Sequence, residues 1–409
     1  MSRRWGLHRL ALVLALALGC VVGASPRQDG KPPILLLLSF DGWRWDYIDQ
    51  LPAPNLKALA ARGVRARALI PAFPVLTFPN HYTIVTGLYP EHHGVIANNM
   101  RDASMPERFT QSSETAKDAR WWGGEPIWVT AIRQGRRADT MFWPGTEAAI
   151  HGVRPTSWMP YDKKFGTRDR VAQALTWLAL PEADRPSFVS LYFDEVDTAG
   201  HDFGPLSPEL ATAASHLDDA LGQLVDGVHR LGLDDRTSIV IVSDHGMTPT
   251  SYDRVIYLDA MLDINTIEIL EYGSTLMINP RDGDVDALYG RLHGRHPKLA
   301  IYRREDIPAR LHFRDNARIP AIVGVPDDGW SVTTGQRLAT EELHVGAHGY
   351  EPATPNMGAL FVAAGPALRN GLVVAPFENI HVYDLLCRIL QITPEKNDGR
   401  AEVTRGFMR

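Results

Sequence analysis

The sequence predicts an α/β fold, in which a doubly wound, mostly parallel sheet is flanked by helices and carries a small inserted α+β cap. Short apolar runs alternate with segments of helical spacing, which is typical of doubly wound sheets. The runs are continuous, which suits strands that are buried on both faces. A segment with a different pattern interrupts this order before the last apolar run.

The expected elements of the core follow in chain order. The apolar runs predict strands at Ile34–Ser39, Ser187–Phe193, Thr237–Val242 and Ala359–Ala364. Helical spacing predicts helices at Pro54–Ala61, Arg170–Ala179, Glu209–Leu231 and Ile380–Leu390. These elements define a main domain at residues 33–394, between a linker at 25–32 and a C-terminal tail at 395–409.

The interrupting segment is expected to form the cap, at about residues 253–342. It contains a stretch at Thr266–Asn279, a short helix near Val285–Gly294, and further stretches at Leu299–Arg303 and Arg318–Val325. Because this segment lies between the last two predicted core strands, we expect an α+β insertion there rather than an additional core layer.

Composition and charge limit the class of protein. The chain has 409 residues, of which 44% are apolar and 22% charged, and this balance is globular. Its net charge is −6 and it has no basic run, which argues against sequence-specific nucleic-acid binding. Small anionic substrates are not excluded, because the charge of a bound metal can outweigh the global charge.

The N-terminus predicts export to the periplasm or the medium. Residues 1–24 have the form of a signal peptide, with Arg3, Arg4 and Arg9 before an apolar core at Leu10–Leu18 that is too short to span a bilayer. The alternatives are an uncleaved membrane anchor and a lipid attached to Cys20. Elsewhere the sequence has no stretch that is long and apolar enough to cross a membrane.

Cysteine is almost absent from the chain. The sequence has two, and removal of the signal leaves Cys387 alone, so an exported chain would have no intramolecular disulfide. Cys387 lies in an apolar periodic run, which predicts a small buried side chain rather than a catalytic thiol.

Acids and histidines follow the predicted strands at the points where they end. The carboxyl ends of strands in an open α/β sheet meet at one edge, where sites form. Three aspartates and three histidines would meet there, which is about two sets of zinc-type ligands. They are Asp41, Asp197, His201, Asp244, His245 and His348.

The spacing of these residues supports the grouping. Asp197 and His201 are four residues apart, so one helical turn would place both on one face. Asp244 and His245 can reach one ion only if the strand has ended before them, and Gly246 permits such a turn. Taken singly, each has a simpler interpretation, Asp41 as a helix cap and Asp197 with His201 as a surface pair. Their coincidence on one predicted edge favours a metal site.

Thr77 and Asn98 are candidates for the chemistry itself. We interpret Thr77 as a helix N-cap with Pro79 in the first turn, so free N–H groups would lie nearby. A divalent cation would lower the pKa of its hydroxyl and make it a nucleophile. Asn98 could donate a hydrogen bond to a phosphate oxygen, although a plain turn asparagine is equally consistent with the sequence.

Several segments resemble the nucleotide pyrophosphatase/phosphodiesterase family of the alkaline-phosphatase superfamily, from about residue 33 to residue 394. The motifs that carry the resemblance are SFDGWR at 39–44, TFPNHYTIVTGLYPEHHGV at 77–95, GGEPIWVT at 123–130, FWPG at 142–145, DEVDTAGHDFGP at 194–205, SDHGM at 243–247, and AHGYEP with PNMGALFVAAGP at 347–366. The lean chain, without cysteine-rich or nuclease-like modules, is similar to a bacterial, exported form.

The resemblance implies an alkaline-phosphatase-like fold and a role for each site residue. Two Zn²⁺ ions would be held, one by Asp41, Thr77, Asp244 and His245, the other by Asp197, His201 and His348. Thr77 would be the nucleophile, and Asn98 would bind a phosphate oxygen. Phe78 and Tyr161 would sandwich a nucleotide base, while His81 and Tyr82 would be structural.

The implied activity is hydrolysis of nucleotide phosphodiesters or pyrophosphates to 5′-monophosphates by a monomer or weak homo-oligomer. Two alternatives stay open on the same metal core, a phospholipid head-group (choline-type) phosphodiesterase and a phosphomonoesterase. A monoesterase would need extra positive donors, and Arg44 is the basic residue that lies beside a motif. An exported binding protein without catalysis would be expected to lack some of the ligands.

Overall fold

The computed structural model describes residues 30–111 and 114–409. The signal peptide at 1–24, Cys20 and most of the linker at 25–32 lie outside the described residues. Residues Pro32–Arg409 form one unit, and the description below concerns that unit alone.

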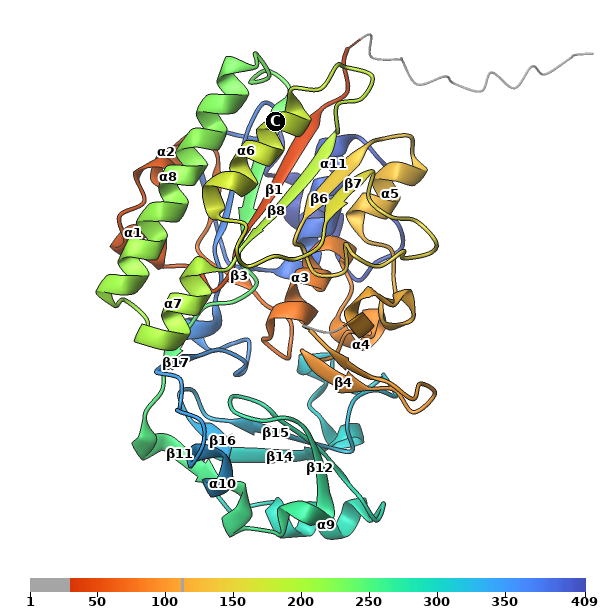
Figure 1. The fold of residues 1–409 in the computed structure, drawn as a ribbon, viewed down its shortest axis with the longest axis vertical. Coiled ribbons are helices and arrows are strands. Elements are labelled where there is room, and N and C mark those ends of the chain that lie inside the picture. Colours follow the sequence, from red (N-terminus) through yellow and green to blue (C-terminus); the bar gives the residue numbers. More distant parts are fainter. Residues whose placement is uncertain (1–29, 112–113) are drawn as a thin grey trace, which may run out of the picture. The chain divides into compact units, whose positions relative to one another are not determined.

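An eight-stranded sheet forms the centre of this unit, in the order β19-β2-β18-β9-β1-β8-β6-β7. Figure 1 labels four neighbouring strands of this sheet, β1, β8, β6 and β7. Strand β1 pairs in parallel with both β8 and β9, and β6 pairs in parallel with β7 and β8. Strand β18 is the exception, because it is antiparallel to β9 and to β2. The sheet is therefore mostly parallel, as predicted. The strands are β1 (Ile34–Phe40), β2 (Val64–Ala66), β6 (Ala138–Met141), β7 (Ser157–Met159), β8 (Phe188–Phe193), β9 (Thr237–Val242), β18 (Phe361–Ala364) and β19 (Leu372–Val374).

Helices cover both faces of this sheet, which explains why every residue of β1 except Ser39 is apolar. Leu35 and Leu37 belong to one buried cluster, whereas Ile34, Leu36 and Leu38 belong to another. The first cluster includes residues of α3 (Thr77–Thr86), α5 (Ile127–Arg133) and α11 (Val382–Leu390). The second includes residues of α2 (Pro54–Ala61), α6 (Thr167–Leu178) and α8 (Pro208–Arg230). The four predicted core helices are therefore confirmed within a few residues at their ends.

The segment predicted as a cap forms a separate four-stranded antiparallel sheet, in the order β12-β13-β15-β14. Its elements are β12 (Ile267–Glu271), β13 (Leu276–Pro280), α9 (Val285–Leu292), β14 (Leu299–Arg303) and β15 (Ile322–Pro326). They enclose their own buried cluster. The exact domain boundaries stay predictions.

Shorter elements connect these layers. They are α1 (Tyr47–Gln50), β3 (Leu69–Ile70), α4 (Pro90–His93), β4 (Asn99–Arg101), β5 (Arg108–Thr110), α7 (Glu195–Phe203), β10 (Thr248–Pro249), β11 (Val255–Tyr257), β16 (Ser331–Thr333), α10 (Gly335–Leu338), β17 (Gly346–Ala347), β20 (Phe377–Glu378) and α12 (Ala401–Arg405). Helix α12 lies in the segment predicted as the C-terminal tail.

Cys387 is a free, buried thiol in α11, as the sequence predicted. Burial raises its pKa, so it packs as a small apolar side chain.

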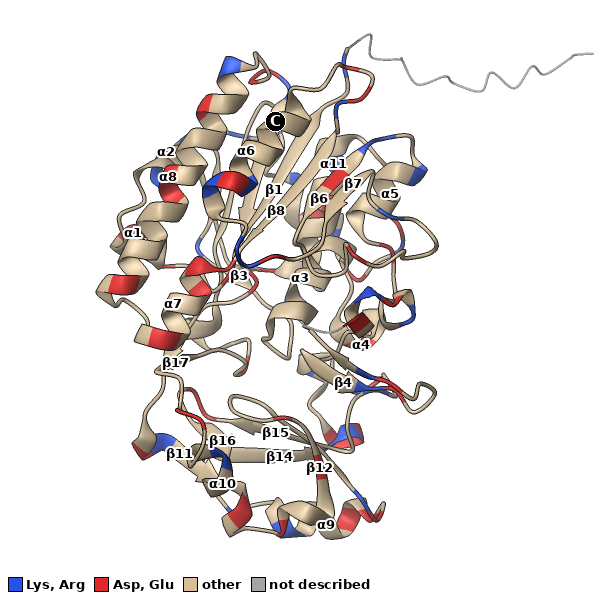
Figure 2. Ribbon diagram, in the orientation of Figure 1, with Lys and Arg blue, Asp and Glu red and all other residues tan. Residues whose placement is uncertain are grey.

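The charged residues of the described chain do not gather in one region. Figure 2 shows acidic and basic residues interspersed over its helices and loops. Among residues 30–111 and 114–409, none of the helices has the length and apolarity that a bilayer crossing requires.

Candidate active site

The predicted acids and histidines meet at the carboxyl ends of three neighbouring strands. Asp41 follows β1, Asp244 and His245 follow β9, and Asp197 lies on α7, which follows β8. His348 precedes β18, and because β18 is antiparallel to β9, its amino end lies at the same edge of the sheet. The sixth residue, His201, is on α7 with Asp197. The convergence that the strand ends predicted is therefore present.

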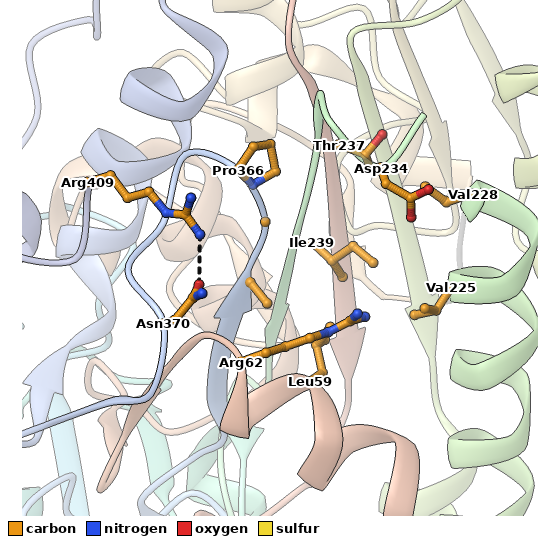
Figure 3. A pocket seen from close by; sticks show the side chains of 12 residues that line it. Leu59, Arg62, Val225, Val228, Asp234, Thr237, Ile239, Pro366, Asn370 and Arg409 are labelled. Carbon is orange, nitrogen blue, oxygen red and sulfur yellow. Dashed lines mark hydrogen bonds between the residues drawn. The ribbon is translucent and has the colours of Figure 1, made fainter. Parts of the chain in front are cut away.

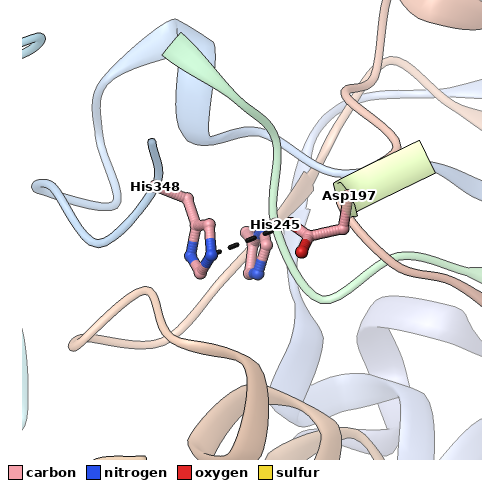
Figure 4. Close-up of side chains that lie close together, drawn as sticks. All are labelled: Asp197, His245 and His348. Carbon is pink, nitrogen blue, oxygen red and sulfur yellow. Dashed lines mark ion pairs between the residues drawn. The ribbon is translucent and has the colours of Figure 1, made fainter. Parts of the chain in front are cut away.

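The distances between these side chains are short. His245 Nε2 lies 2.8 Å from Asp244 Oδ2 and 3.5 Å from Asp41 Oδ1. Asp197 lies between two further imidazoles, with Oδ2 3.5 Å from His201 Nε2 and Oδ1 3.8 Å from His348 Nε2. The rings of His245 and His348 are stacked, with centroids 3.4 Å apart (Figure 4).

Each of the three predicted histidine ligands is oriented by a backbone carbonyl. The Nδ1 atoms of His201, His245 and His348 lie 2.8, 3.0 and 2.9 Å from the carbonyl oxygens of Gly346, Gly246 and Val75. A carbonyl can only accept, so each Nδ1 carries the hydrogen and each Nε2 keeps a lone pair. Three lone pairs therefore face the aspartates, which is how metal-binding histidines are arranged.

Three buried carboxylate oxygens in this cluster have no hydrogen-bond partner among the described residues. They are Asp41 Oδ1, Asp197 Oδ1 and Asp244 Oδ2. Buried charged oxygens are costly unless they are paired or bind a metal. Lone pairs of nitrogen and oxygen that converge without donors fit divalent cations, and this donor set suits zinc.

The donor atoms fall into two groups of three whose members lie within 4.8 Å of one another. One group is Asp197, His245 and His348, and the other is Asp41, His81 and Asp244. His81 does not fit a ligand role, because its Nδ1 bonds to Thr77 O at 2.8 Å and its Nε2 to Ser39 Oγ at 2.7 Å. Its interpretation as a structural residue therefore agrees with its contacts.

Glycines allow the strand ends to approach so closely. Gly42, directly after Asp41, has a φ of +67°, and a Cβ there would lie 2.8 Å from Asp197 Cα. At Gly246 the reason differs from the predicted turn, because its φ is outside the left-handed region. A Cβ at Gly246 would instead lie 2.1 Å from the carbonyl oxygen of Asn356. Glycine is required at position 246 because a side chain would collide with this carbonyl, and not because the backbone needs a conformation that only glycine adopts.

Thr77 lies at this cluster, but the N-cap prediction for it is wrong. The N-cap of α3 is Leu76, which has extended backbone and makes no side-chain cap, and Thr77 is the first helical residue. Its hydroxyl is consequently available to the cluster, with Oγ1 3.4 Å from His245 Nε2. The start of α3 therefore brings the Thr77 hydroxyl to the edge of the acid–histidine cluster.

Burial and mutual repulsion shift the pKa values of the cluster. Burial raises the pKa of Asp41 well above its usual value, and the charges of Asp244 and Asp197 add to the effect. Burial lowers the pKa of His348 well below its usual value, and the neighbouring His245 and His201 lower it further. A neutral imidazole is the form that binds a metal.

Asn98 and Phe78 lie beside Thr77. The Phe78 backbone N–H donates to Asn98 Oδ1 at 3.0 Å. This bond uses one of the N–H groups that the sequence predicted to be free at the helix start. It also fixes the amide of Asn98, whose Nδ2 makes no hydrogen bond to a residue of the described chain.

A cavity of about 500 Å³ opens beside the cluster, lined by Asp41, Thr77 and Asp197. Both predicted base-binding aromatics, Phe78 and Tyr161, also line it. Tyr161 is 47% exposed, and its hydroxyl donates to Asp194 Oδ2 at 2.9 Å. The cavity therefore joins the acid–histidine cluster to the predicted aromatic pair.

Several residues of this cavity were not predicted from the sequence. They include Lys117, Trp122, Glu147, Lys163 and Tyr192. Glu147 lies two residues after the FWPG motif, which could have indicated it. Tyr192 is within a predicted buried strand, where an aromatic residue resembles ordinary core.

Tyr192 orients Asp41, because its hydroxyl donates to Asp41 Oδ2 at 2.6 Å. Removal of that hydroxyl in Tyr192→Phe should leave one more oxygen of Asp41 unpaired and loosen the cluster. We expect about 10- to 100-fold weaker metal binding, the usual effect of losing a residue that orients a ligand. Competition with a metallochromic chelator would measure it, and an unchanged affinity would contradict the role.

Arg44 is not available to a substrate. Its guanidinium forms an ion pair with Asp46 at 2.6 Å and donates to the carbonyl of Met247 at 3.2 Å. It also lies over the ring of Tyr47, 4.9 Å from its centroid. The basic residue that the sequence analysis noted for a monoesterase thus has a structural role.

A second cavity, of about 310 Å³, lies away from this chemistry (Figure 3). Its lining includes Thr237, the first residue of β9, whereas Asp244 follows the last residue of that strand. The two cavities therefore lie toward opposite ends of the sheet.

Comparison with solved structures identifies the fold. The murine ectonucleotide pyrophosphatase/phosphodiesterase 5, solved as an inactive variant in complex with AMP, is 34% identical with a TM-score of 0.88. The match covers 92% of this chain and 100% of that chain. The fold is therefore alkaline-phosphatase-like. Together with the acid–histidine cluster, this fold places the chain in a class of metal-dependent hydrolases.

Sequence comparison identifies the family. The model of the type I phosphodiesterase/nucleotide pyrophosphatase family matches residues 35–351. Human ectonucleotide pyrophosphatase/phosphodiesterase family member 5 is 35% identical over 95% of this chain and 80% of its own length. A venom phosphodiesterase of Crotalus durissus collilineatus is 39% identical over 89% of this chain and 45% of its own length. The chain belongs to the nucleotide pyrophosphatase/phosphodiesterase family.

Proposed function

We propose that this enzyme hydrolyses nucleotide phosphodiester or pyrophosphate bonds to nucleoside 5′-monophosphates through a phosphothreonine intermediate, with two zinc ions. The observation that carries the proposal is the position of the Thr77 hydroxyl, 3.4 Å from His245 Nε2, beside buried carboxylate oxygens that have no hydrogen-bond partner in the described part of the chain. The AMP complex of the murine relative supports a nucleotide as the substrate.

The ligand sets are those that the family resemblance implies, and the short distances in the cluster support them, although His245 also lies close to Asp197 and His348. Asp41, Asp244 and His245, with Thr77, would hold one ion, since His245 Nε2 is nearest to the oxygens of those aspartates. Asp197, His201 and His348 would hold the other. When bound, the ions would supply Lewis-acid stabilisation of the phosphoryl oxygens and lower the pKa of a coordinated hydroxyl.

The chain's own residues then divide the reaction into two steps. Thr77 Oγ1 loses its proton and forms a bond to phosphorus, while the bond from phosphorus to the leaving oxygen breaks. Water then attacks phosphorus in this threonine–nucleotide diester, the bond from phosphorus to Thr77 Oγ1 breaks, and a proton from the water restores the hydroxyl as the nucleoside 5′-monophosphate leaves. Asn98, whose Oδ1 is held by Phe78 N–H, would donate from Nδ2 to a non-bridging oxygen.

Phe78 gives a test of the base-binding role. Its ring lines the cavity beside Trp122, with centroids 6.0 Å apart. Phe78→Ala should raise KM for a nucleoside 5′-monophosphate aryl ester about tenfold, because stacking on a base is worth about 1–3 kcal/mol. The KM for an aryl phosphodiester without a base should change little. Equal changes in KM for both substrates would contradict the binding of a base between Phe78 and Tyr161.

The substrate class is tested by comparing four compounds. We expect ATP and a dinucleotide to be turned over with the highest kcat/KM, and glycerophosphocholine and a simple monoester with lower values. The engagement of Arg44 with Asp46 disfavours the monoesterase alternative, since a monoester has an additional negative charge. Preference for the choline compound would replace the nucleotide assignment.

Export remains part of the proposal, with the signal peptide at residues 1–24 and either a free periplasmic form or a lipid anchor at Cys20. The intact mass of the protein isolated from its source would distinguish these forms. Cleavage after Ala24 would give the free form, whereas a diacylated Cys20 at the new N-terminus would give the anchored one.

A further inference from the structure

We propose that Glu271, on the edge strand of the cap, is a positioning residue that holds the turn carrying Asn98 at the phosphate site. This inference rests on the proposed function, because it concerns the orientation of Asn98 toward the substrate. It assigns to the cap a direct part in the chemistry of the core.

The β4–β5 hairpin of the core lies along β12, the edge strand of the cap sheet. Arg101 on β4 forms an ion pair with Glu268 at 3.0 Å. Arg108 on β5 donates to the carbonyl oxygens of Ile269 and Leu270 at 3.3 and 3.2 Å. These contacts bring the hairpin and the cap strand together over the length of the strand.

Glu271 makes the contact nearest to the site. Its Oε1 accepts two hydrogen bonds from Asn99, from the backbone N–H at 2.7 Å and from Nδ2 at 3.1 Å. One carboxylate oxygen thus fixes both the main chain and the side chain of Asn99. The β12–β13 register shifts between Ile269 and Glu271, which is a β-bulge, and bulges commonly re-aim a side chain.

Asn98 precedes Asn99 and is held on its other sides by the core. Its backbone carbonyl accepts from Gln111 N–H at 3.1 Å, and its Oδ1 accepts from Phe78 N–H at 3.0 Å. Three contacts therefore set the direction of the Asn98 Nδ2 atom. Gln111 and Phe78 of the core supply two of them, and the cap supplies the third, through the bonds from Asn99 to Glu271. Loss of that attachment would free the turn next to the proposed phosphate position.

The charge of Glu271 makes this attachment sensitive to pH. Burial raises the pKa of Glu271 to about 7, against the opposite effects of the Asn99 hydrogen bonds and of Arg108 and Arg337. The other charged groups on the packed elements are already paired, Arg101 with Glu268 and Arg337 with Glu341. An ionised carboxylate accepts stronger hydrogen bonds than a neutral one, so the hold on Asn99 should strengthen as the pH rises through 7.

Steady-state kinetics of two variants test the proposal. With a nucleoside 5′-monophosphate aryl ester, Glu271→Ala should lower kcat about tenfold while KM stays within about twofold. Glu271→Gln keeps an oxygen acceptor, so it should recover most of kcat but lose the inflection near pH 7 that we expect in the wild-type profile. Glu268→Ala is the matched control on the same strand, and it should behave as wild type.

Two further results decide the matter. In a variant that already has Asn98→Ala, adding Glu271→Ala should lower kcat little further, because the residue that Glu271 positions is gone. Hydrogen exchange of peptides spanning Asn98 and Asn99 should accelerate in Glu271→Ala but not in Glu268→Ala. The exchange does not depend on turnover, so it still tests the attachment if the nucleotide activity proves wrong. Equal kcat, pH profiles and exchange in both alanine variants would overturn the proposal.

Discussion

Thr77→Ala is expected to abolish turnover, lowering kcat by at least about 10³-fold, because it removes the group that forms the covalent intermediate. The Thr77 hydroxyl is at the first residue of α3 and 3.4 Å from His245 Nε2, whereas the hydroxyls of Thr83 and Thr86 on the same helix contact His93 Nε2 and Tyr82 O instead. Single-turnover assays with a chromogenic diester would measure the loss.

Two variants control for damage to the helix. Thr77→Ser keeps a hydroxyl at the same position and should keep measurable activity. Thr86→Ala, at the other end of α3, removes a hydroxyl that donates to Tyr82 O at 2.7 Å and should keep near wild-type turnover. If Thr77→Ala turned over substrate at the wild-type rate with its metals bound, the phosphothreonine route would be wrong.

Asp197→Asn is expected to have the second-largest effect, with loss of one metal ion per chain and a fall in kcat of more than about 10²-fold. Asp197 lies between His201 and His348, and its Oδ1 is buried without a hydrogen bond among the described residues. Replacement of one oxygen by an amide N–H₂ puts a donor where a cation should be. Elemental analysis together with kcat would measure both losses.

The neighbouring Asp202 supplies the matched control for this experiment. It is an exposed residue of the same helix α7, so Asp202→Asn makes the same chemical change outside the cluster. That variant should retain both ions and near wild-type kcat. Loss of metal from both variants to the same extent would show that α7 is sensitive to charge in general, and would contradict the specific role of Asp197.

Much of the fold could be predicted because burial on both faces leaves a clear pattern in the sequence. Strands β1, β8 and β9 lie in the middle of the sheet, so most residues of each are apolar. Strand β6 contains Asp139 and Thr140 and has no such run, so it was not predicted. Strand β18 has an apolar run, but its antiparallel direction depends on chain connections that a local pattern does not contain.

The candidate site was predictable to the extent that it depends on strand ends. Asp41 directly follows β1 and Asp244 lies two residues after the end of β9, and parallel strands place such residues at one edge. The details that depend on tertiary contacts could not be predicted. Leu76 rather than Thr77 is the N-cap, and the orientation of Asp41 by Tyr192 joins positions 151 residues apart. The contact between Glu271 and Asn99 joins positions 172 residues apart, because the cap strand that carries Glu271 is inserted late in the chain.

The measurement that most directly tests the account is anomalous diffraction at the zinc edge from crystals of the enzyme grown with AMP. We expect two peaks, one among Asp41, Asp244 and His245, the other among Asp197, His201 and His348. We also expect the AMP phosphate to lie beside Thr77. A single peak, or peaks outside this cluster, would contradict the claim that these side chains hold two ions and make the hydroxyl reactive.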